Sequence, residues 1–240
     1  PAPTPNQKVE QVKMFGRQYV EMVLVGDTFD DSYKEAMKEC EKFGKPLVHP
    51  FNDPKVIEGQ GTVGLEIIQQ SKIPIDYIFI PVGGGGLASG LSIAVKALSP
   101  KTKIIGVEPA GAPSMSQSID NGEIIKLNQI EKFVDGASVK RVGDLTFEIC
   151  HRNLDFMTTV HEGKICQTIL EMYNKDAIVA EPAGAMSLAV LDDFKDEIKG
   201  KTVVCLVSGS NNDITRTPEI EERALLYACL LYTSDAADDL

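Results

Sequence analysis

The chain has 240 residues, of which 43% are hydrophobic and 25% charged, and its formal net charge is -11 at pH 7. This composition is ordinary for a globular protein with one large or two small domains. The excess of 35 acidic over 24 basic residues argues against a nucleic acid or an anionic membrane as partner, because both bind basic surfaces. The five cysteines are far apart and form no C-x-x-C pair. They disfavour a zinc site and are typical of free thiols in a reducing cytoplasm.

The first fifty residues predict two helices and one strand. "QKVEQVKMFG" is amphipathic, and "VEMVLVG" (20–26) has the β-branched composition of a short strand. Thr28 is expected to cap a second helix with one apolar face, and Gly44 to end it. Breaker residues at 49–54 predict a domain boundary, followed by a helix from about Thr62.

From there strands and helices alternate along the chain. Strands are expected at 77–81, 103–109, 155–160, 177–181 and 201–209, and the intervening helices include 87–98, 144–154, 162–176 and 182–191. Strands separated by helices indicate a parallel sheet covered on both faces. The apolar run "LLYACLLY" is too short to cross a membrane, and the chain opens without the pattern of a signal peptide.

Four consecutive glycines, Gly83–Gly86, join the first of these strands to its helix. Glycine loses more conformational entropy on folding than any other residue, so such a run needs a reason. A glycine loop that enters a helix offers free backbone N–H groups at the positive end of the helix dipole, which together form an anion site. Two glycines would satisfy a tight turn, so four indicate that a phosphate group binds here.

A dinucleotide is one candidate for that phosphate. Gly83, Gly85 and Ala88 match the pattern G-x-G-x-x-A between a strand and a helix. Glu108 ends the next strand at about the spacing of an acid that holds a ribose hydroxyl. No Gly-Lys-Ser or Gly-Lys-Thr follows the glycines, which excludes a P-loop. A nicotinamide-dependent oxidoreductase therefore stays an open alternative.

Seven sequence blocks point to a particular family. In chain order they are "VEMVLVGDTFDDSYKEA", "VHPFNDPKVIEGQGTVGLEI", "PVGGGGLASG", "GVEPAGAPSM", "FVDGASVKRVG", "VAEPAGAMSLAVL" and "CLVSGSNNDITRTPEI". Over residues 1–227 the chain resembles the threonine ammonia-lyase (threonine dehydratase) family of fold type II pyridoxal-phosphate enzymes, to which serine racemase also belongs. The resemblance implies an α/β, tryptophan synthase β-like fold with a parallel sheet covered by helices in two domains, incomplete at its N-terminus.

The same resemblance divides the chain and assigns its site residues. It implies the remainder of a small domain at 1–49, a large cofactor-binding domain at 50–227, and a non-native or disordered tail at 228–240. The residues expected to bind pyridoxal 5'-phosphate are Gly83, Gly84, Gly85, Gly86, Leu87, Ser208, Glu181 and Gly136. The first five would hold the phosphate through their backbone, and Ser208 would hydrogen-bond the pyridine nitrogen.

Each of the last three residues also has a purely structural interpretation. Ser208 can end a strand, Glu181 can precede the helix that Pro182 opens, and Gly136 can form a plain turn. The physics of a serine partner nevertheless suits the chemistry, because a hydroxyl leaves the ring nearly neutral and loss of a β-hydroxyl needs only modest carbanion stabilisation.

A divalent-cation site at Glu108 is suggested by the resemblance to serine racemase. That pattern needs a second acid six residues further on, where this chain has Ser114. Carboxylates are the ligands that hard divalent cations prefer, and only one is present here. We therefore expect no dedicated metal.

The function implied is dehydration and deamination of L-threonine, and of L-serine, to 2-oxobutanoate or pyruvate and ammonia. The Schiff-base lysine and the Ser-x-Gly-Asn segment of the family are expected upstream of residue 1, while Lys72, Lys140 and Lys164 lack that context. The chain alone is therefore expected to be inactive, with no catalytic residue of its own. The resemblance further implies a cytoplasmic homo-oligomer, a dimer or tetramer, serving isoleucine biosynthesis. A serine racemase-like enzyme and a non-catalytic ligand-binding remnant are the remaining alternatives.

Overall fold

The computed structural model describes residues 1–238. Its helices and strands are α1 (Asn6–Gly16), η1 (Arg17–Tyr19), α2 (Phe29–Phe43), α3 (Pro54–Gln70), β1 (Tyr77–Pro81), α4 (Gly86–Leu98), β2 (Lys103–Pro109), α5 (Ser114–Asn121), α6 (Asp144–Asn153), β3 (Phe156–Val160), α7 (Glu162–Asp176), α8 (Pro182–Ala189), η2 (Leu191–Phe194), β4 (Val203–Cys205), η3 (Ile214–Arg216) and α9 (Thr217–Asp238). Helix α9 continues through most of the expected tail 228–240, whose last two residues lie outside the described range. Within that range no helix combines the length and the apolar character needed to cross a membrane.

A parallel sheet forms the centre of the molecule. Within residues 1–238 it has four strands in the order β3-β2-β1-β4, and each neighbouring pair is parallel. Helices connect consecutive strands, which parallel pairing requires. The expected α/β architecture is therefore confirmed.

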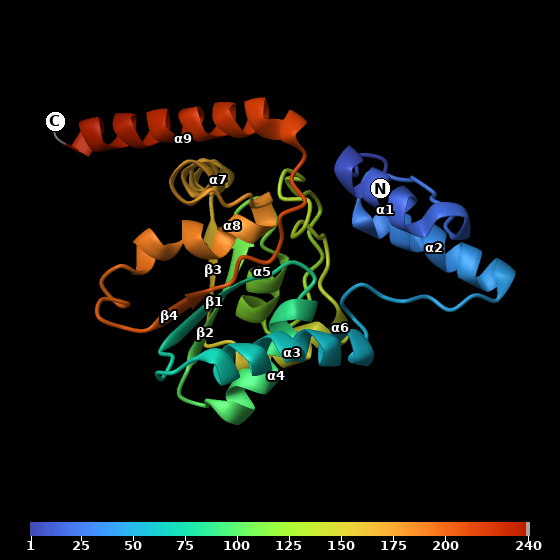
Figure 1. The fold of residues 1–240 in the computed structure, drawn as a ribbon, viewed down its shortest axis with the longest axis horizontal. Coiled ribbons are helices and arrows are strands. Elements are labelled where there is room, and N and C mark those ends of the chain that lie inside the picture. Colours follow the sequence, from blue (N-terminus) through green and yellow to red (C-terminus); the bar gives the residue numbers. More distant parts are fainter. Residues whose placement is uncertain (239–240) are drawn as a thin grey trace.

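The sheet is covered by helices on both faces (Figure 1). Ile78, Ile80 and Ile104 face the side of α4 and α6, where they pack against Leu91. Phe79 points to the opposite face, into a second core shared with α7 and α8. Successive strand side chains alternate between faces, so a strand buried on both sides is apolar throughout. All five residues of β1 are buried, as this arrangement demands.

Helices α3 and α4 pack unusually closely because glycines lie between them. A Cβ on Gly64 would lie 2.8 Å from the carbonyl oxygen of Leu91, and a Cβ on Gly90 would overlap the carbonyl oxygen of Ile57. The expected start of α3 at Thr62 is wrong. The helix begins eight residues earlier, at Pro54, and Asp53 caps it by accepting from the backbone N–H of Lys55 at 2.8 Å.

Two expected strands are absent from the described chain. Residues 20–26 run extended from Val20 (φ -122°, ψ 127°) but pair with no other strand of the described chain. Residues 177–181 begin at Ala177, whose φ of 55° ends α7 in the left-handed conformation and turns the chain. A strand needs a partner strand as well as β-branched residues, and among residues 1–238 neither segment pairs with a strand of the sheet.

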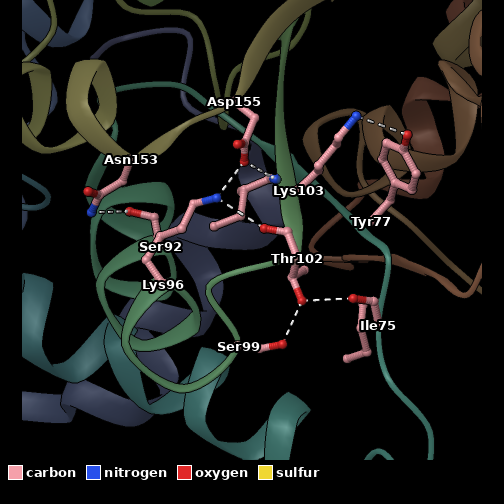
Figure 2. A network of polar contacts seen from close by, with 10 residues as sticks. Ile75, Tyr77, Ser92, Lys96, Ser99, Thr102, Lys103, Asn153 and Asp155 are labelled. Atoms are coloured by element: carbon pink, nitrogen blue, oxygen red, sulfur yellow. Dashed lines mark hydrogen bonds and ion pairs between the residues drawn. The ribbon is translucent and has the colours of Figure 1, made fainter.

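The amino ends of the strands are tied together by a polar network (Figure 2). The Asp155 carboxylate accepts from the backbone N–H of Ile104 and from Lys96 Nζ, both at 2.7 Å. Thr102 Oγ1 donates to the carbonyl oxygen of Ile75 at 2.8 Å. These contacts fix the starts of β1, β2 and β3 relative to α4, at the edge of the sheet opposite to the glycine loop.

Helices α1 and α2 form a separate N-terminal unit that stands beside the sheet body (Figure 1). Thr28 caps α2 as predicted, and its side chain and the Asp31 carboxylate form a reciprocal capping box. Gly44 ends α2 at φ 62°, again as predicted. Within the described chain α1 buries Val9 alone and α2 buries none of its residues. The unit is therefore held to the body by few contacts, so each contact contributes strongly to its position.

Candidate functional site

The predicted cofactor residues gather at the carboxyl ends of the strands. A cavity of about 260 Å³ opens there between β1 and the segment after β4. Its lining includes Phe51, the glycine loop Gly83–Gly86, Leu87, Gly136, Ala183 and Ser208. Open parallel sheets bind ligands at this edge, beyond the carboxyl ends of their strands. The structure thus brings the glycine loop and Ser208 to one cavity, as the expected binding of a single cofactor requires.

Neighbouring residues pack so closely against the glycine loop that side chains would not fit there. A Cβ on Gly83 would lie 2.8 Å from the Ala137 Cα, and a Cβ on Gly84 would overlap the Phe51 ring. Gly85 has a φ of 92°, and a Cβ there would lie 2.7 Å from Met115 Cε. Close packing by the protein is therefore a second reason for these glycines, beside the phosphate that their number predicts.

In the structure, a phosphate site is indicated by the backbone N–H groups of this loop. Among the described residues no hydrogen-bond acceptor is found for the N–H groups of Gly83–Leu87, whereas the Gly85 carbonyl accepts from Ser89 N at 2.9 Å. Gly85 is the N-cap of α4, so these donors lie at the positive end of the helix dipole. A phosphate group fits this donor set, because its oxygens accept several hydrogen bonds at once.

Thr146 holds the loop from behind and was not predicted from the sequence. Its hydroxyl donates to the Gly84 carbonyl oxygen at 2.6 Å and accepts from the Gly143 N–H at 3.1 Å. The side chain is fully buried at the start of α6. Its only sequence signal is its place three residues after Gly143, the spacing of a helix cap.

The segment 49–53 covers the other side of the loop and was also missed. His49 Nδ1 accepts from the backbone N–H groups of Phe51 and Asn52, at 3.2 and 2.9 Å. Burial lowers the pKa of His49 below its usual value, against the opposing charge of Asp53, which favours the neutral ring that this acceptor role needs. The ring of Phe51 lies against the glycine loop, with its centroid 4.6 Å from that of His49. From the sequence, the "HPFNDP" stretch is assigned to a boundary and to a family block, but its residues are given no role in the site.

Glu181 and Gly136 lie together beside Ser208. The Glu181 N–H donates to the Gly209 carbonyl oxygen at 3.0 Å, and a Cβ on Gly209 would overlap the Glu181 carboxylate. A Cβ on Gly136 would lie 3.2 Å from the same carboxylate. Glu181 therefore lies behind the cavity wall, in contact with two of its backbone segments, while Gly136 and Ser208 line the cavity directly.

Glu108 does not face this cavity. It is fully buried, and its carboxylate accepts from the N–H groups of Met115 and Ser116 and from the Ser116 hydroxyl, each at 2.7 Å. Burial raises the pKa of Glu108 to about 7, while these hydrogen bonds oppose the rise. A carboxylate engaged in this way cannot hold a ribose hydroxyl, so the Rossmann interpretation of Glu108 is wrong. Among the described residues no cluster of three or more His, Cys, Asp or Glu side chains could hold a metal.

The fold and site together define a class of protein. At the carboxyl edge of a parallel α/β sheet, one cavity is lined by Ser208 and by a glycine loop whose N–H groups have no acceptor among the described residues. A phosphorylated cofactor fits such a site, because its phosphate can accept from the loop while its ring reaches toward the serine. In agreement, the family model for "Pyridoxal-phosphate dependent enzyme" matches residues 1–209, and the chain belongs to this family. The oxidoreductase alternative is thereby excluded, and the fold type II assignment is confirmed.

Comparison with curated proteins shows which members of this family the chain resembles. The chain is 58% identical over 227 residues to the L-threonine dehydratase biosynthetic IlvA of Halalkalibacterium halodurans, covering 95% of this chain and 55% of that protein. It is 56% identical over 231 residues to the protein of the same name from Staphylococcus aureus, with the same two coverages. The chain thus spans about half the length of these relatives, and the predicted resemblance to threonine dehydratases is confirmed.

Solved structures agree with the sequence relatives. The processed form of threonine deaminase isoform 2 from Solanum lycopersicum matches with a TM-score of 0.85 and 39% identity, over 94% of this chain and 62% of that one. Maize serine racemase matches with a TM-score of 0.81 and 31% identity, over 94% of this chain and 69% of that one. Both similarities extend over the sheet body and the N-terminal unit, because they cover nearly the whole chain.

Proposed function

We propose that this chain is the cofactor-binding part of a lyase that converts L-threonine, and also L-serine, to 2-oxobutanoate or pyruvate and ammonia. The observation that carries the proposal is the single cavity lined by Ser208 and by Gly83–Leu87, whose N–H groups have no acceptor among the described residues. The names of the relatives support the substrate, since proteins 58% and 56% identical to the chain are named L-threonine dehydratases.

Each site residue has a proposed task. The N–H groups of Gly83, Gly84, Gly85, Gly86 and Leu87 hold the phosphate of pyridoxal 5'-phosphate, and the Ser208 hydroxyl hydrogen-bonds the pyridine nitrogen. Gly136 lies along the ring because it has no side chain, and Glu181 supports the segments on either side. The bound cofactor supplies an electron sink for the α-carbon of the substrate, and a neutral serine partner keeps that sink moderate.

No lysine of the described chain lines this cavity. Lys164 is paired with Asp192, Lys72 is exposed and Lys140 is partly exposed. We propose that the Schiff-base lysine and the group that binds the substrate carboxylate belong to a further segment of the longer protein. Residues 1–240 therefore bind the cofactor non-covalently and do not turn over substrate.

The proposal extends to domain division, assembly and cellular place. We assign residues 1–49 to a small domain, 50–227 to the cofactor-binding domain, and 228–240 to a tail without a role in the site. The longer protein is a cytoplasmic homo-oligomer of two or four chains that serves isoleucine biosynthesis. All five cysteines are free thiols in the part of the chain that the structure describes, which suits a reducing compartment. Sedimentation of the longer protein tests its oligomeric state.

Titration with pyridoxal phosphate tests the cofactor site in residues 1–240. We expect saturable binding by absorbance, binding at least about tenfold weaker for pyridoxal without its phosphate, and no competition by NAD. Ser208→Ala should weaken pyridoxal phosphate about tenfold, the loss of one hydrogen bond of about 1.4 kcal/mol. It should leave binding of inorganic phosphate unchanged, because the glycine loop is intact.

Ser210→Ala is the matched control, since Ser210 is an exposed serine two residues away. Equal affinities of both serine variants for pyridoxal phosphate would contradict the role of Ser208. The substrate is tested on the longer protein by release of 2-oxobutanoate from L-threonine. Formation of D-serine from L-serine without ammonia would instead support the racemase alternative.

A further inference from the structure

Lys8 of α1 makes an ionic contact that reaches from the N-terminal unit to the sheet body. Its Nζ donates to the Asp135 carboxylate at 2.6 Å and lies 3.5 Å from the Glu181 carboxylate. The second oxygen of Asp135 accepts from Arg216 Nη1 at 3.0 Å. We call Lys8, Asp135, Glu181 and Arg216 the Lys8 network. Its four residues come from α1, two loops and η3.

This network is partly shielded from water, unlike the other ion pair of the same helix. The side chains of Lys8 and Glu181 are 27% and 15% exposed, whereas those of Lys13 and Glu10 are 59% and 69% exposed. Burial works against the charge of Lys8, but the hydrogen bond and charges of Asp135 and Glu181 raise its pKa above the usual value. A charge at such a site interacts more strongly than a surface pair, and removing one partner leaves the others uncompensated.

The far end of the network lies against the cofactor cavity. Asp135 directly precedes Gly136, which lines the cavity. The Glu181 carboxylate lies against Gly136 and Gly209, and Gly209 directly follows Ser208. A change in the position of either carboxylate therefore displaces backbone on the side of the cavity where the cofactor ring is proposed to lie. The glycine loop, which is proposed to hold the phosphate, is held by Thr146 and Phe51, and its first residue Gly83 packs against Ala137, two residues after Asp135.

Other residues of α1 also approach the body. The Gln7 backbone N–H donates to the Asp213 carboxylate, and Asn211 lines a cavity together with Lys8. A cavity of about 250 Å³ separates the N-terminal unit from the loop that carries Asp135, and Lys8 and Phe29 line it. Phe29 of α2 reaches the segment 49–53 through the Phe51 ring, with 5.4 Å between the centroids, but this contact lies on the phosphate side. Lys8 is the residue of α1 whose side chain contacts the two carboxylates that lie beside Gly136 and Gly209.

We propose that Lys8 is a positioning residue, which holds the carboxylates of Asp135 and Glu181 and so fixes the ring side of the cofactor cavity while docking α1 beside it. The inference rests on the proposed function, because it assigns the ring to this side of the cavity. It separates two parts of the site, since phosphate binding depends on the glycine loop and ring binding depends also on Lys8.

Two lysine substitutions in one helix test the proposal. Lys8→Met keeps the aliphatic length but removes the charge, and Lys13→Met is the matched control at an exposed position of α1. We expect Lys8→Met to bind pyridoxal phosphate about tenfold more weakly than the unchanged chain and to bind inorganic phosphate equally well. Amide hydrogen exchange of α1 without ligand should become faster in Lys8→Met. Lys8→Arg should restore most of the affinity, because it keeps the charge.

The outcomes distinguish this inference from the function on which it rests. If Lys8→Met and Lys13→Met bind pyridoxal phosphate equally well and exchange equally fast in α1, the role of Lys8 is refuted and the cofactor site stands. Equal losses of pyridoxal phosphate and inorganic phosphate in Lys8→Met also refute it, because they indicate general loosening. If the unchanged chain binds inorganic phosphate but shows no preference for pyridoxal phosphate, the proposed function fails and this inference fails with it.

Discussion

Glu108 is a carboxyl group enclosed by protein at the carboxyl end of β2. Its oxygens accept three hydrogen bonds from Met115 and Ser116 at the start of α5. Those donors hold α5 against the strand, at the favourable end of the helix dipole. In this chain the carboxylate therefore stabilises the start of α5. The position at which a cation site would need a second acid is occupied by the buried Ser114.

The protonation of Glu108 gives a pH-dependent stability. Its pKa is about 7 in the folded chain against an ordinary value of 4.5, so between these values the folded state holds a proton that the unfolded state has lost. Stability contributed by this group is present below pH 4.5 and is lost as pH rises to 7, by up to about 3 kcal/mol at 1.36 kcal/mol per unit. Urea unfolding of the unchanged chain and of Glu108→Gln at pH 5 and pH 7.5 measures the difference.

The Gln variant cannot titrate at this position, so its stability relative to the unchanged chain should increase with pH. Glu123→Gln, at an exposed position, should run parallel to the unchanged chain. Parallel profiles for Glu108→Gln as well would show that the buried carboxyl stays ionised throughout.

Residues of the site were predictable where the signal is local. The glycine loop and Ser208 directly follow strands, and such positions meet at one edge of a parallel sheet. Lys8 and Phe51 were not predictable, because their roles depend on distant partners. Lys8 and Asp135 are 127 residues apart, and no spacing rule relates them. Thr146 likewise acts on a carbonyl 62 residues earlier in the chain.

At the scale of elements, helices with a marked start and end were predicted best. Thr28 caps the start of α2 and Gly44 ends it, as expected, because helix capping depends only on residues near each end. The start of α3 is predicted too late in the sequence. The glycines that follow Asp53 resemble helix breakers as long as the helix α4, which packs closely against α3, is not known. The strands expected at 20–26 and 177–181 are absent from the sheet. Their composition suits a strand, but composition does not reveal whether a partner strand lies alongside.

The glycines between α3 and α4 predict opposite effects of the same substitution. A Cβ on Gly90 would overlap the carbonyl oxygen of Ile57, so Gly90→Ala should destabilise the chain by about 2 kcal/mol or more. Among the described residues nothing lies within 4 Å of a Cβ on Gly59, so Gly59→Ala should stabilise it by about 0.5–1 kcal/mol. Thermal unfolding measures both. A loss of stability in both variants would show that α3 requires flexibility rather than close approach.

At the scale of the whole molecule, the parallel order of the strands followed from their alternation with helices, but the position of β4 beside β1 did not. Strand β4 pairs with β1 on one side, and on its other side no strand of the described chain follows. Val207, just beyond it, is 42% exposed. Unpaired strand edges with apolar flanks promote association between chains.

We therefore expect residues 1–240 to self-associate as their concentration rises from about 1 to about 100 μM, the range in which exposed edges aggregate. Val207→Lys should weaken this association about tenfold, because a charge at an edge opposes pairing. Ile178→Lys, at a residue 44% exposed between α7 and α8, is the control. Sedimentation velocity measures both, and a monomer at every concentration would contradict the expectation.

The side chain of Asp76, just before β1, accepts a hydrogen bond at 2.8 Å from the backbone N–H of Thr202, 126 positions further along the chain. During synthesis β1 is made early, yet its neighbour on this side leaves the ribosome only after that whole stretch has been translated. At ordinary elongation speeds the wait is on the order of 10 s. The nascent chain therefore offers chaperones a half-built sheet for many seconds, and the proposed cofactor can be captured only after Ser208 has been translated.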